Sequence, residues 1–484
     1  MTTTDPAKLV LLGIPFHDVT FAETVAWARD RIRAHQPAYI ATANIDFVMQ
    51  AWRDPELQRI LLEASLVLAD GMPIVWLSRM FGPRLCERVT GSDLVPLLAG
   101  MCRDEGFRPF LLGGAPGVAE KAATELQRRY PGLQIAGCYS PPLADVVAMD
   151  HAAILAKLEA AKPDLLLIAF GAPKQEKWAN MHVRQWQVPL AIGIGGTLDF
   201  LAGAQTRAPR FVQQIGFEWL WRMGTNPKRL FRRYVGNLFF FFRVSTRLLL
   251  LRAGFPRLGK TPVLVFQGLE KLTTDVLVVR WPGLLDAAAA QSWREHLDAE
   301  AGTRAVALNL AHARWLTSLE LGALLVLTQA CRARGSRLFL LGVEHHARRL
   351  LEFCRLDRYL ELVDTPEQLS HAVRALRGPG QAGSLERDRK YRLRFALPVE
   401  LTSANLPQWR ERWNNVWANA DKDVLEVLID GAATHFLDSA ALGFLVGIKK
   451  TVDQHHLSWQ CGGFGSAARQ VMKIARLDTL LLTD

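Results

Sequence analysis

The sequence predicts an α/β protein with a Rossmann-like domain in its first half, a basic amphipathic segment after it, and two small α/β domains in its second half. Three observations support this prediction: short apolar runs that stop at glycine, proline or polar residues, one stretch of concentrated positive charge, and a tandem repeat. With 484 residues, of which 50% are hydrophobic, the chain can form several domains with cores of their own.

Short apolar runs in the first half have the length and composition of buried strands in a parallel sheet. They occupy residues 39–42, 66–69, 109–112, 165–170 and 190–194. Open α/β sheets bind ligands beyond the carboxyl ends of their strands, so residues that end or follow these runs are candidates for a binding site. They are Thr42, Asn44, Asp70, Gly113, Gly114, Gln175, Glu176, Gly196 and Asp199. The alternative is ordinary strand-to-helix turn chemistry, with Asp70 as a helix cap.

A glycine-rich loop at 113–117 follows one of these predicted strands and precedes a predicted helix that starts near Val118. Glycines in such a turn let the backbone approach a phosphate, and the helix N-terminus offers free N–H groups. The loop is neither a strict dinucleotide-binding fingerprint nor a Walker loop, because no Lys-Ser/Thr pair closes it.

Positive charge is concentrated in residues 201–260, which hold twelve lysines and arginines against the single acid Glu218 and so carry the whole net charge of +11. This concentration predicts an anionic partner for the segment. Arg243, Arg247 and Arg252 interrupt a Phe- and Leu-rich run, so the run falls short of the ~20 apolar residues of a membrane span and suits the bilayer interface. The alternative is a helix packed on the next domain. No nucleic-acid-binding motif accompanies the charge, so we expect no nucleic-acid partner.

Cysteine usage and the N-terminus favour a cytoplasmic protein. The six cysteines are scattered and form no Cys-x-x-Cys pair, which fits a reducing compartment better than a disulfide scaffold or a zinc site. Residues 1–6 show no basic stretch followed by an apolar one, so we expect no signal peptide.

The second half contains a tandem repeat with a constant offset of 121 residues. Each copy alternates apolar strands with helices, which predicts a small α/β sandwich. The segments that match are 316–318 with 437–439, 321–322 with 442–443, 342 with 463, and 355–357 with 476–478. The predicted organisation is a Rossmann-like domain at 1–205, the basic segment at 206–260, repeat domains at 261–376 and 391–484, and a linker at 377–390.

Taken in order, the motifs of the first half fall at residues 42–46, 69–73, 88–93, 112–114, 170–176, 195–200, 207–209, 218–222 and 227–234. Over about residues 9–245 the chain resembles the WecG/TagA/CpsF glycosyltransferases. One departure is Ala43, which stands where the family usually has proline. Because this change removes no chemical group, it does little to the resemblance.

The resemblance implies transfer of an N-acetylmannosamine-type sugar, or a relative, from a UDP-sugar to a sugar on undecaprenyl diphosphate at the inner face of the membrane, with inversion. Asp70, the only acid of its segment, is then the expected general base, and Thr42 and Asn44 are expected to hold sugar hydroxyls. The expected donor-binding residues are Gly113, Gly114, Gln175, Glu176, Gly196 and Asp199.

Arginine binds diphosphates through bidentate contacts, so arginines of the basic segment are the candidates for holding the acceptor diphosphate or UDP. They are Arg207, Arg222, Arg229, Arg232 and Arg233. No Asp-x-Asp metal motif occurs in the first half, so we expect no metal cofactor, with arginines and backbone amides meeting the charge on UDP.

The repeat domains resemble STAS domains, which implies a protein partner. In that family a serine or threonine at the start of the helix can be phosphorylated, and Ser439 occupies this place in the second copy. The alternative is that Ser439 only caps the helix. For the whole chain, the alternative function is a regulatory scaffold in which the repeat domains bind a protein and the first half senses nucleotide-sugar.

Overall fold

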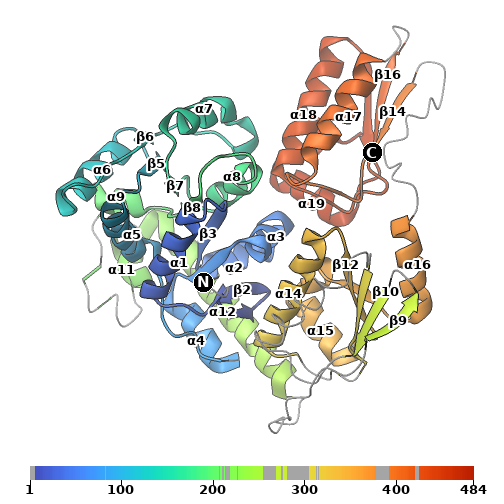
Figure 1. The fold of residues 1–484 in the computed structure, drawn as a ribbon, viewed down its shortest axis with the longest axis horizontal. Helices are drawn as coiled ribbons and strands as arrows, with labels where there is room; N and C mark the ends of the chain where they lie inside the picture. The colour runs from blue at the N-terminus through green and yellow to red at the C-terminus, as the bar shows by residue number, and fades with distance from the viewer. Residues whose placement is uncertain are drawn as a thin grey trace.

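A computed structural model describes residues 6–81, 83–205, 208–209, 212, 218–225, 227–253, 269–273, 276–280, 305–311, 313, 316–377, 392–419 and 424–483. Three α/β units are visible in Figure 1: the first-half domain, a unit formed by the first repeat copy, and a unit formed by the second. The predicted linker at 377–390 lies, except for Arg377, outside the described residues.

The first-half domain is built on a six-stranded sheet in which every neighbouring pair of strands is parallel. The order is β4-β3-β8-β7-β5-β6, with β3 (Ala38–Ala43), β4 (Leu66–Ala69), β5 (Pro109–Gly113), β6 (Gly137–Tyr139), β7 (Leu165–Ala169) and β8 (Leu190–Gly193). All five predicted strands are present, shifted by at most one residue at either end, and both faces of these apolar runs are covered, as in other parallel sheets.

Helices cover both faces of this sheet, with one apolar cluster on each face. They are α1 (Phe21–Arg33), α2 (Ile45–Ala51), α3 (Pro55–Glu63), α4 (Met72–Phe81), α5 (Gly91–Glu105), α6 (Val118–Arg129), α7 (His151–Ala161), α8 (Lys174–His182) and α9 (Thr197–Leu201). A short 3₁₀ helix, η1 (Val146–Ala148), precedes α7, and an antiparallel hairpin, β1 (Lys8–Leu11) and β2 (Ile14–His17), lies at the N-terminal end.

The basic segment forms two helices, α11 (Glu218–Thr225) and α12 (Pro227–Ala253). One side of α12 is buried through Val244 and Leu248, which belong to the large apolar cluster. The other side exposes large apolar residues: Phe231, Val235, Leu238, Phe239, Phe242, Leu249 and Leu250. α12 therefore packs on the protein along one side and exposes an apolar surface along the other, and contact of that surface with a bilayer stays a prediction. Among the described residues, no helix combines the length and the hydropathy needed to cross a bilayer.

The first repeat copy forms a five-stranded sheet of order β13-β12-β11-β10-β9, parallel except for the edge strand β9. Its strands are β9 (Leu269–Thr273), β10 (Val276–Arg280), β11 (Ala305–Asn309), β12 (Arg337–Leu341) and β13 (Glu361–Val363). Its described helices are α14 (Ser318–Ala333), α15 (His345–Phe353), η2 (Leu356–Arg358) and α16 (Pro366–Arg377).

The second copy has a parallel sheet of order β14-β16-β18 and a short parallel pair, β15-β17. Its strands are β14 (Arg392–Ala396), β15 (Glu400–Leu401), β16 (Glu426–Asp430), β17 (Phe436–Leu437) and β18 (Ser458–Gly462). Its helices are α17 (Leu406–Ala418), α18 (Ser439–Gln454), α19 (Ser466–Ile474) and α20 (Asp478–Leu481).

The offset of 121 residues is preserved in three dimensions. It relates both ends of β11 to β16, of α14 to α18, of β12 to β18 and of α15 to α19. The left-handed backbone positions at Gly342 and Arg355 recur at Gly463 and Arg476 with the same offset. The two copies therefore share a strand-helix-strand-helix core.

The first repeat copy is fused to the first-half domain through a common apolar core. One cluster of buried residues contains Leu9 and Leu11 of β1 together with Leu321 and Leu324 of α14. The packing is close enough that a Cβ on Gly322 would lie 2.0 Å from the carbonyl oxygen of Lys8. These two units therefore form one continuous body.

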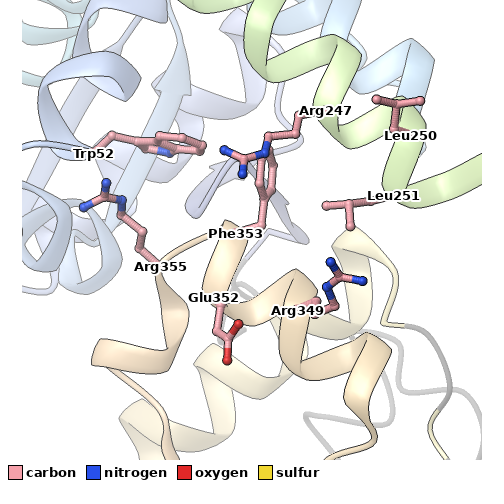
Figure 2. A pocket seen from close by; sticks show the side chains of 8 residues that line it. All are labelled: Trp52, Arg247, Leu250, Leu251, Arg349, Glu352, Phe353 and Arg355. Atoms are coloured by element: carbon pink, nitrogen blue, oxygen red, sulfur yellow. The ribbon is translucent and has the colours of Figure 1, made fainter.

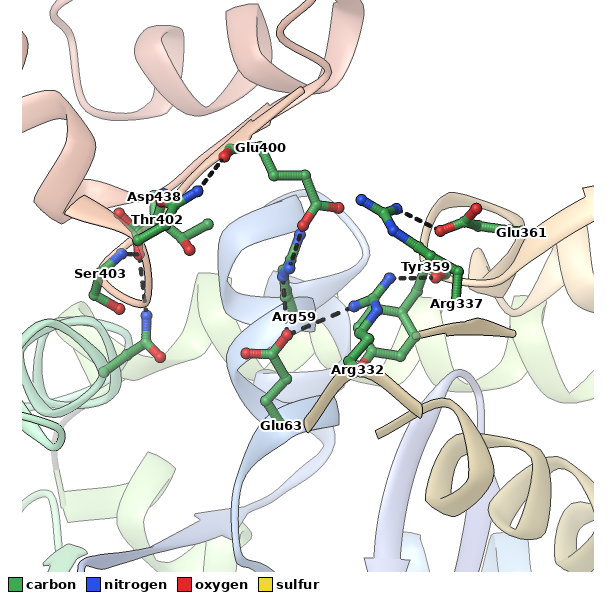
Figure 3. A network of polar contacts seen from close by, with 12 residues as sticks. Arg59, Glu63, Arg332, Arg337, Tyr359, Glu361, Glu400, Thr402, Ser403 and Asp438 are labelled. Atoms are coloured by element: carbon green, nitrogen blue, oxygen red, sulfur yellow. Dashed lines mark hydrogen bonds and ion pairs between the residues drawn. The ribbon is translucent and has the colours of Figure 1, made fainter. Parts of the chain in front are cut away.

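All three units meet around Arg59 of α3 (Figure 3). Its guanidinium contacts Glu63 of the same helix (3.0 Å) and Glu400 of the second repeat copy (2.7 Å). Arg332 of the first copy lies 3.8 Å from Glu63. Burial alone would raise the pKa of Glu400, but the hydrogen bond and charge of Arg59 lower it to about 2. Glu400 is therefore ionised and paired with Arg59, as a partly buried carboxylate requires.

Candidate active site

Five strand ends, those of β4, β3, β8, β7 and β5, meet at one edge of the six-stranded sheet, and the candidate residues from the sequence follow them. Ala43 pairs with Ala69 in the sheet register, so Asn44 and Asp70 come next on adjacent strands. The backbone N–H of Asp70 donates to the carbonyl of Ala43 (3.0 Å). The Cβ position at Gly71 lies 3.7 Å from the Cβ of Asn44. The structure thus places Asp70 and Asn44 at adjacent strand ends of this edge.

Asn44 and Thr42 both have structural bonds at this edge. Asn44 is the N-cap of α2, and its Oδ1 accepts from the N–H groups of Asp46 (3.0 Å) and Phe47 (3.3 Å). Its side-chain NH₂ is then the group suited to contact a ligand. Thr42 is buried, and its hydroxyl donates to the carbonyl of Gly193 on β8 (2.9 Å). The Thr42 bond joins the ends of β3 and β8, and contact of Thr42 with a sugar hydroxyl stays a prediction.

The N-terminus of α5 also belongs to this edge, and the sequence analysis gave it no role. Thr90 is its N-cap, and the Cβ position at Gly91 lies 3.6 Å from the Thr42 hydroxyl and 3.7 Å from that of Thr197. The available signal was the capping pattern Thr90-x-x-Asp93, in which the Thr90 hydroxyl bonds to Asp93 (2.7 Å). The free N–H groups of a 15-residue helix therefore face the same region as the candidate site.

Gln175 and Glu176 are buried beneath the loop that follows β8, with exposed fractions of 1% and 0%. Gln175 accepts from the N–H of Gly195 through Oε1 (3.1 Å) and donates to Glu176 through Nε2 (2.8 Å). Tyr39 donates its hydroxyl to the same carboxylate (3.2 Å). Burial raises the pKa of Glu176 to about 7. In this structure the pair fixes the Gly195–Gly196 loop from below, and a direct contact with the donor stays a prediction.

Two glycines at this edge leave no room for a side chain. A Cβ on Gly193 would lie 2.5 Å from the hydroxyl of Tyr39, and one on Gly113 would lie 2.7 Å from the carbonyl of Ala169. Gly113 and Gly114 have positive φ angles of 108° and 78°. Gly196 is exposed at the surface of its loop, and its Cβ position lies 3.7 Å from the Asp199 carboxylate. The predicted glycines therefore shape the edge, and their contact with a phosphate stays a prediction.

The side chains of the five candidate arginines lie outside the described part of the structure. Arg222 lies in α11 and Arg229, Arg232 and Arg233 lie in α12, but their side chains are outside the described part of the structure. Arg207 is outside the described residues altogether.

Ser439 is buried and contacts the first-half domain directly. Its backbone N–H donates to Oε1 of Glu56 (2.6 Å) and its hydroxyl donates to Oε2 (2.8 Å). Glu56 also pairs with Lys177 (2.8 Å), which pairs with Asp54 (2.7 Å). A carboxylate from α3 thus occupies the N-terminal end of α18, where the helix dipole favours an anion. The alternative that Ser439 caps the helix is wrong, because the N-cap is Asp438.

The parallel sheet with helices on both faces gives the first half a Rossmann-like α/β fold, with a polar edge at the place where such sheets bind ligands. The sequence profile of the "Glycosyl transferase WecG/TagA/CpsF family" matches residues 9–254, and the chain belongs to this family. It is a glycosyltransferase of the hexosyltransferase class. We refer to residues 9–254 as the transferase domain. The STAS domain profile matches residues 271–369, which cover most of the first repeat copy.

Two curated relatives carry the same description, N-acetylglucosaminyldiphosphoundecaprenol N-acetyl-beta-D-mannosaminyltransferase. The protein of Bacillus spizizenii is 32% identical over 192 residues, which are 40% of this chain and 73% of the relative. The protein of Staphylococcus aureus strain MRSA252 is 28% identical over 228 residues, which are 47% of this chain and 88% of the relative. Both resemblances cover less than half of this chain.

Proposed function

We propose that this chain transfers an N-acetylmannosamine-type sugar, or a relative, from a UDP-sugar to a saccharide linked to undecaprenyl diphosphate, in cell-surface or exopolysaccharide biosynthesis. The observation that carries the proposal is that Asp70 and Asn44 directly follow the paired residues Ala69 and Ala43 on adjacent strands of the sheet. The names of the relatives, which mention both a diphosphoundecaprenol acceptor and an N-acetylmannosaminyl group, support this choice of substrates.

In the proposed mechanism, Asp70 removes the proton from the acceptor hydroxyl as that oxygen attacks the anomeric carbon. UDP leaves from the opposite face, so the configuration inverts. The Asn44 amide holds a sugar hydroxyl, and the free N–H groups of α5 together with arginines of the basic segment meet the negative charge that develops on UDP. No metal takes part in this scheme, and unchanged turnover in the presence of a chelator is its test.

The experiment on the base replaces Asp70 with asparagine, which keeps the shape and removes the basic carboxylate. We expect donor binding to persist while turnover with a short-chain polyprenyl-diphosphate acceptor falls by ~10²-fold or more. Asp104→Asn, an exposed acid of α5, is the matched control and should leave turnover unchanged. Wild-type turnover in Asp70→Asn would refute the base assignment, and an anomeric configuration retained in the product would refute inversion.

We also propose that residues 391–484 form a second STAS-like domain and that the two repeat domains bind a protein partner. The conserved offset of 121 residues between the secondary structure elements of the copies supports the first part. The location that fits these substrates is the inner face of the plasma membrane, with the exposed apolar side of α12 in contact with lipid. A regulatory scaffold would bind UDP-sugar without turnover, and the assay above separates the two functions.

A further inference from the structure

A cleft of about 570 Å³ lies on one side of the junction between the transferase domain and the first repeat copy (Figure 2). One wall is the C-terminal part of α12 together with Trp52, which ends α2, and the other is the end of α15 and the turn after it. This volume is in the usual range for a small-molecule site. Neither repeat copy nor transferase domain forms the cleft alone.

The cleft is lined by an excess of positive charge. Arg247 of α12, Arg349 of α15 and Arg355 of the following turn line it, and Glu352 is the acid among the lining residues (Figure 2). Within the described part of the chain, neither Arg247 nor Arg349 forms an ion pair. Arg355 lies 5.6 Å above the ring of Trp52, and burial, followed by the charge of Arg358, lowers its pKa. Three arginines line this cleft against one lining acid, Glu352, and Asp357 offsets part of the charge of Arg355, so the lining keeps a positive excess that favours an anion with several oxygens.

The remaining wall of the cleft is apolar and continues onto the surface. Trp52 packs edge-on against Phe353 (ring centroids 5.3 Å apart), and Leu250 and Leu251 of α12 close the other side (Figure 2). Leu250 is 69% exposed, and Phe242, two turns earlier on α12, is 60% exposed. A ligand with an anionic head and an apolar tail can therefore place its head among the arginines and its tail along α12.

We propose that this cleft binds the phosphate headgroup of an anionic phospholipid, so that α12 and the first repeat copy engage the membrane together. The proposal rests on the membrane contact of α12 in the proposed function, and it adds a specific headgroup site that needs α15. Trp52 and Asn44 lie at opposite ends of α2, a seven-residue helix about 10 Å long. A headgroup in the cleft would therefore hold the candidate active site close to the bilayer surface.

The test measures binding of the full chain to vesicles of phosphatidylcholine with and without phosphatidylglycerol. Arg349→Ala and the double variant Arg247→Ala/Arg349→Ala remove charges from the cleft, and Arg410→Ala, an exposed arginine of α17, is the matched control. We expect each cleft arginine to contribute about 5-fold to the affinity for anionic vesicles, and the control to have no more than the effect of bulk charge. Phe242→Asp, on the exposed side of α12 and outside the cleft lining, should weaken vesicle binding while leaving the binding of inorganic diphosphate unchanged.

A second arm separates the bilayer lipid from a soluble phosphate ligand. Farnesyl diphosphate and inorganic diphosphate are titrated into the same variants by calorimetry. Arginine-dependent binding to these ligands, with vesicle binding unaffected, would overturn the proposal in favour of a diphosphate substrate. Equal losses in Arg349→Ala and Arg410→Ala would overturn it in favour of general electrostatic attraction.

A transferase assay with a soluble short-chain acceptor tests the proposed function separately from the lipid site. Arg349→Ala should turn over such an acceptor at the wild-type rate, because the cleft lies outside the candidate active site. If the wild-type chain shows no transferase activity at all, the proposed function fails while the vesicle assay still decides the lipid site. Thermal unfolding of each variant excludes misfolding as the cause of lost binding.

Discussion

Replacing Ser439 with aspartate should detach the second repeat copy from the transferase domain. In the native structure both the N–H and the hydroxyl of Ser439 donate to the buried Glu56 carboxylate, at 2.6 and 2.8 Å. Aspartate removes the hydroxyl donor and places a second carboxylate against the first. The same change imitates part of the charge of a phosphate, so it also reports what phosphorylation of Ser439 would do.

The size of the effect follows from two contributions. A hydrogen bond to a charged group contributes about 1.5–3 kcal/mol, and its loss applies equally to Ser439→Ala. Two carboxylates about 4 Å apart at an effective dielectric constant of about 20 repel by about 4 kcal/mol, which applies to Ser439→Asp alone. Lys177, 2.8 Å from Glu56, offsets part of this repulsion. We therefore expect Ser439→Asp to weaken docking by at least ~10²-fold more than Ser439→Ala.

Hydrogen exchange of α3 and α18 in the full chain measures this effect, since both helices lose protection when the interface opens. Glu56→Gln supplies the internal control, because a glutamine amide can donate to the new aspartate. The double variant Glu56→Gln/Ser439→Asp should regain much of the protection that Ser439→Asp loses. If the two changes add without any such rescue, or if Ser439→Asp behaves like Ser439→Ala, the docking argument is refuted.

Three further outcomes are expected. The pKa of Glu176 in the folded protein is about 7, above its ordinary value of 4.5, so ionisation of this buried carboxyl group destabilises the fold as the pH rises from 4.5 to 7. Glu176→Gln should therefore be up to about 3 kcal/mol more stable than wild type above pH 7, with no gain below pH 4.5, as measured by urea unfolding. Phe239→Ser and Phe242→Ser, at positions that are 68% and 60% exposed, should weaken binding to vesicles without lowering the melting temperature. A lowered melting temperature would indicate that this side of α12 is packed against the protein. Gly322→Ala should destabilise the transferase domain and the first repeat copy together by about 1–3 kcal/mol, because the new Cβ would lie 2.0 Å from the carbonyl oxygen of Lys8. Separate unfolding transitions for the two units would contradict a shared core.

The positions of the central strands could be predicted from the sequence, because a short apolar run bounded by glycine or polar residues is typical of a strand buried on both faces. The residues that follow such strands, including Asp70 and Asn44, could be assigned to one edge for the same reason. The direction of a side chain after a strand end is set by packing from other elements. The sequence therefore could not show that Gln175 and Glu176 point down into the fold, where Tyr39 and Gly195 bind them.

Contacts between distant segments were beyond the reach of local patterns. Glu56 and Ser439 are 383 residues apart, and nothing in the chain near either one indicates the other. The two sequence interpretations of α12 were treated as alternatives because its charge pattern fits both. In the structure Leu248 is buried on one side of the helix while Phe239 is exposed on the other, and contact of the exposed side with a bilayer stays a prediction.

The apolar core that joins β1 to α14 has a consequence for synthesis of the chain on the ribosome. The partners Leu11 and Leu321 are separated by about 310 residues, which at ~5–20 residues per second takes roughly 15 to 60 s to translate. During that time the hairpin β1-β2 has emerged while the helix that covers it does not yet exist. During this interval the apolar face of the transferase domain that α14 covers in the folded chain is exposed, and a nascent chain in this state is prone to aggregation.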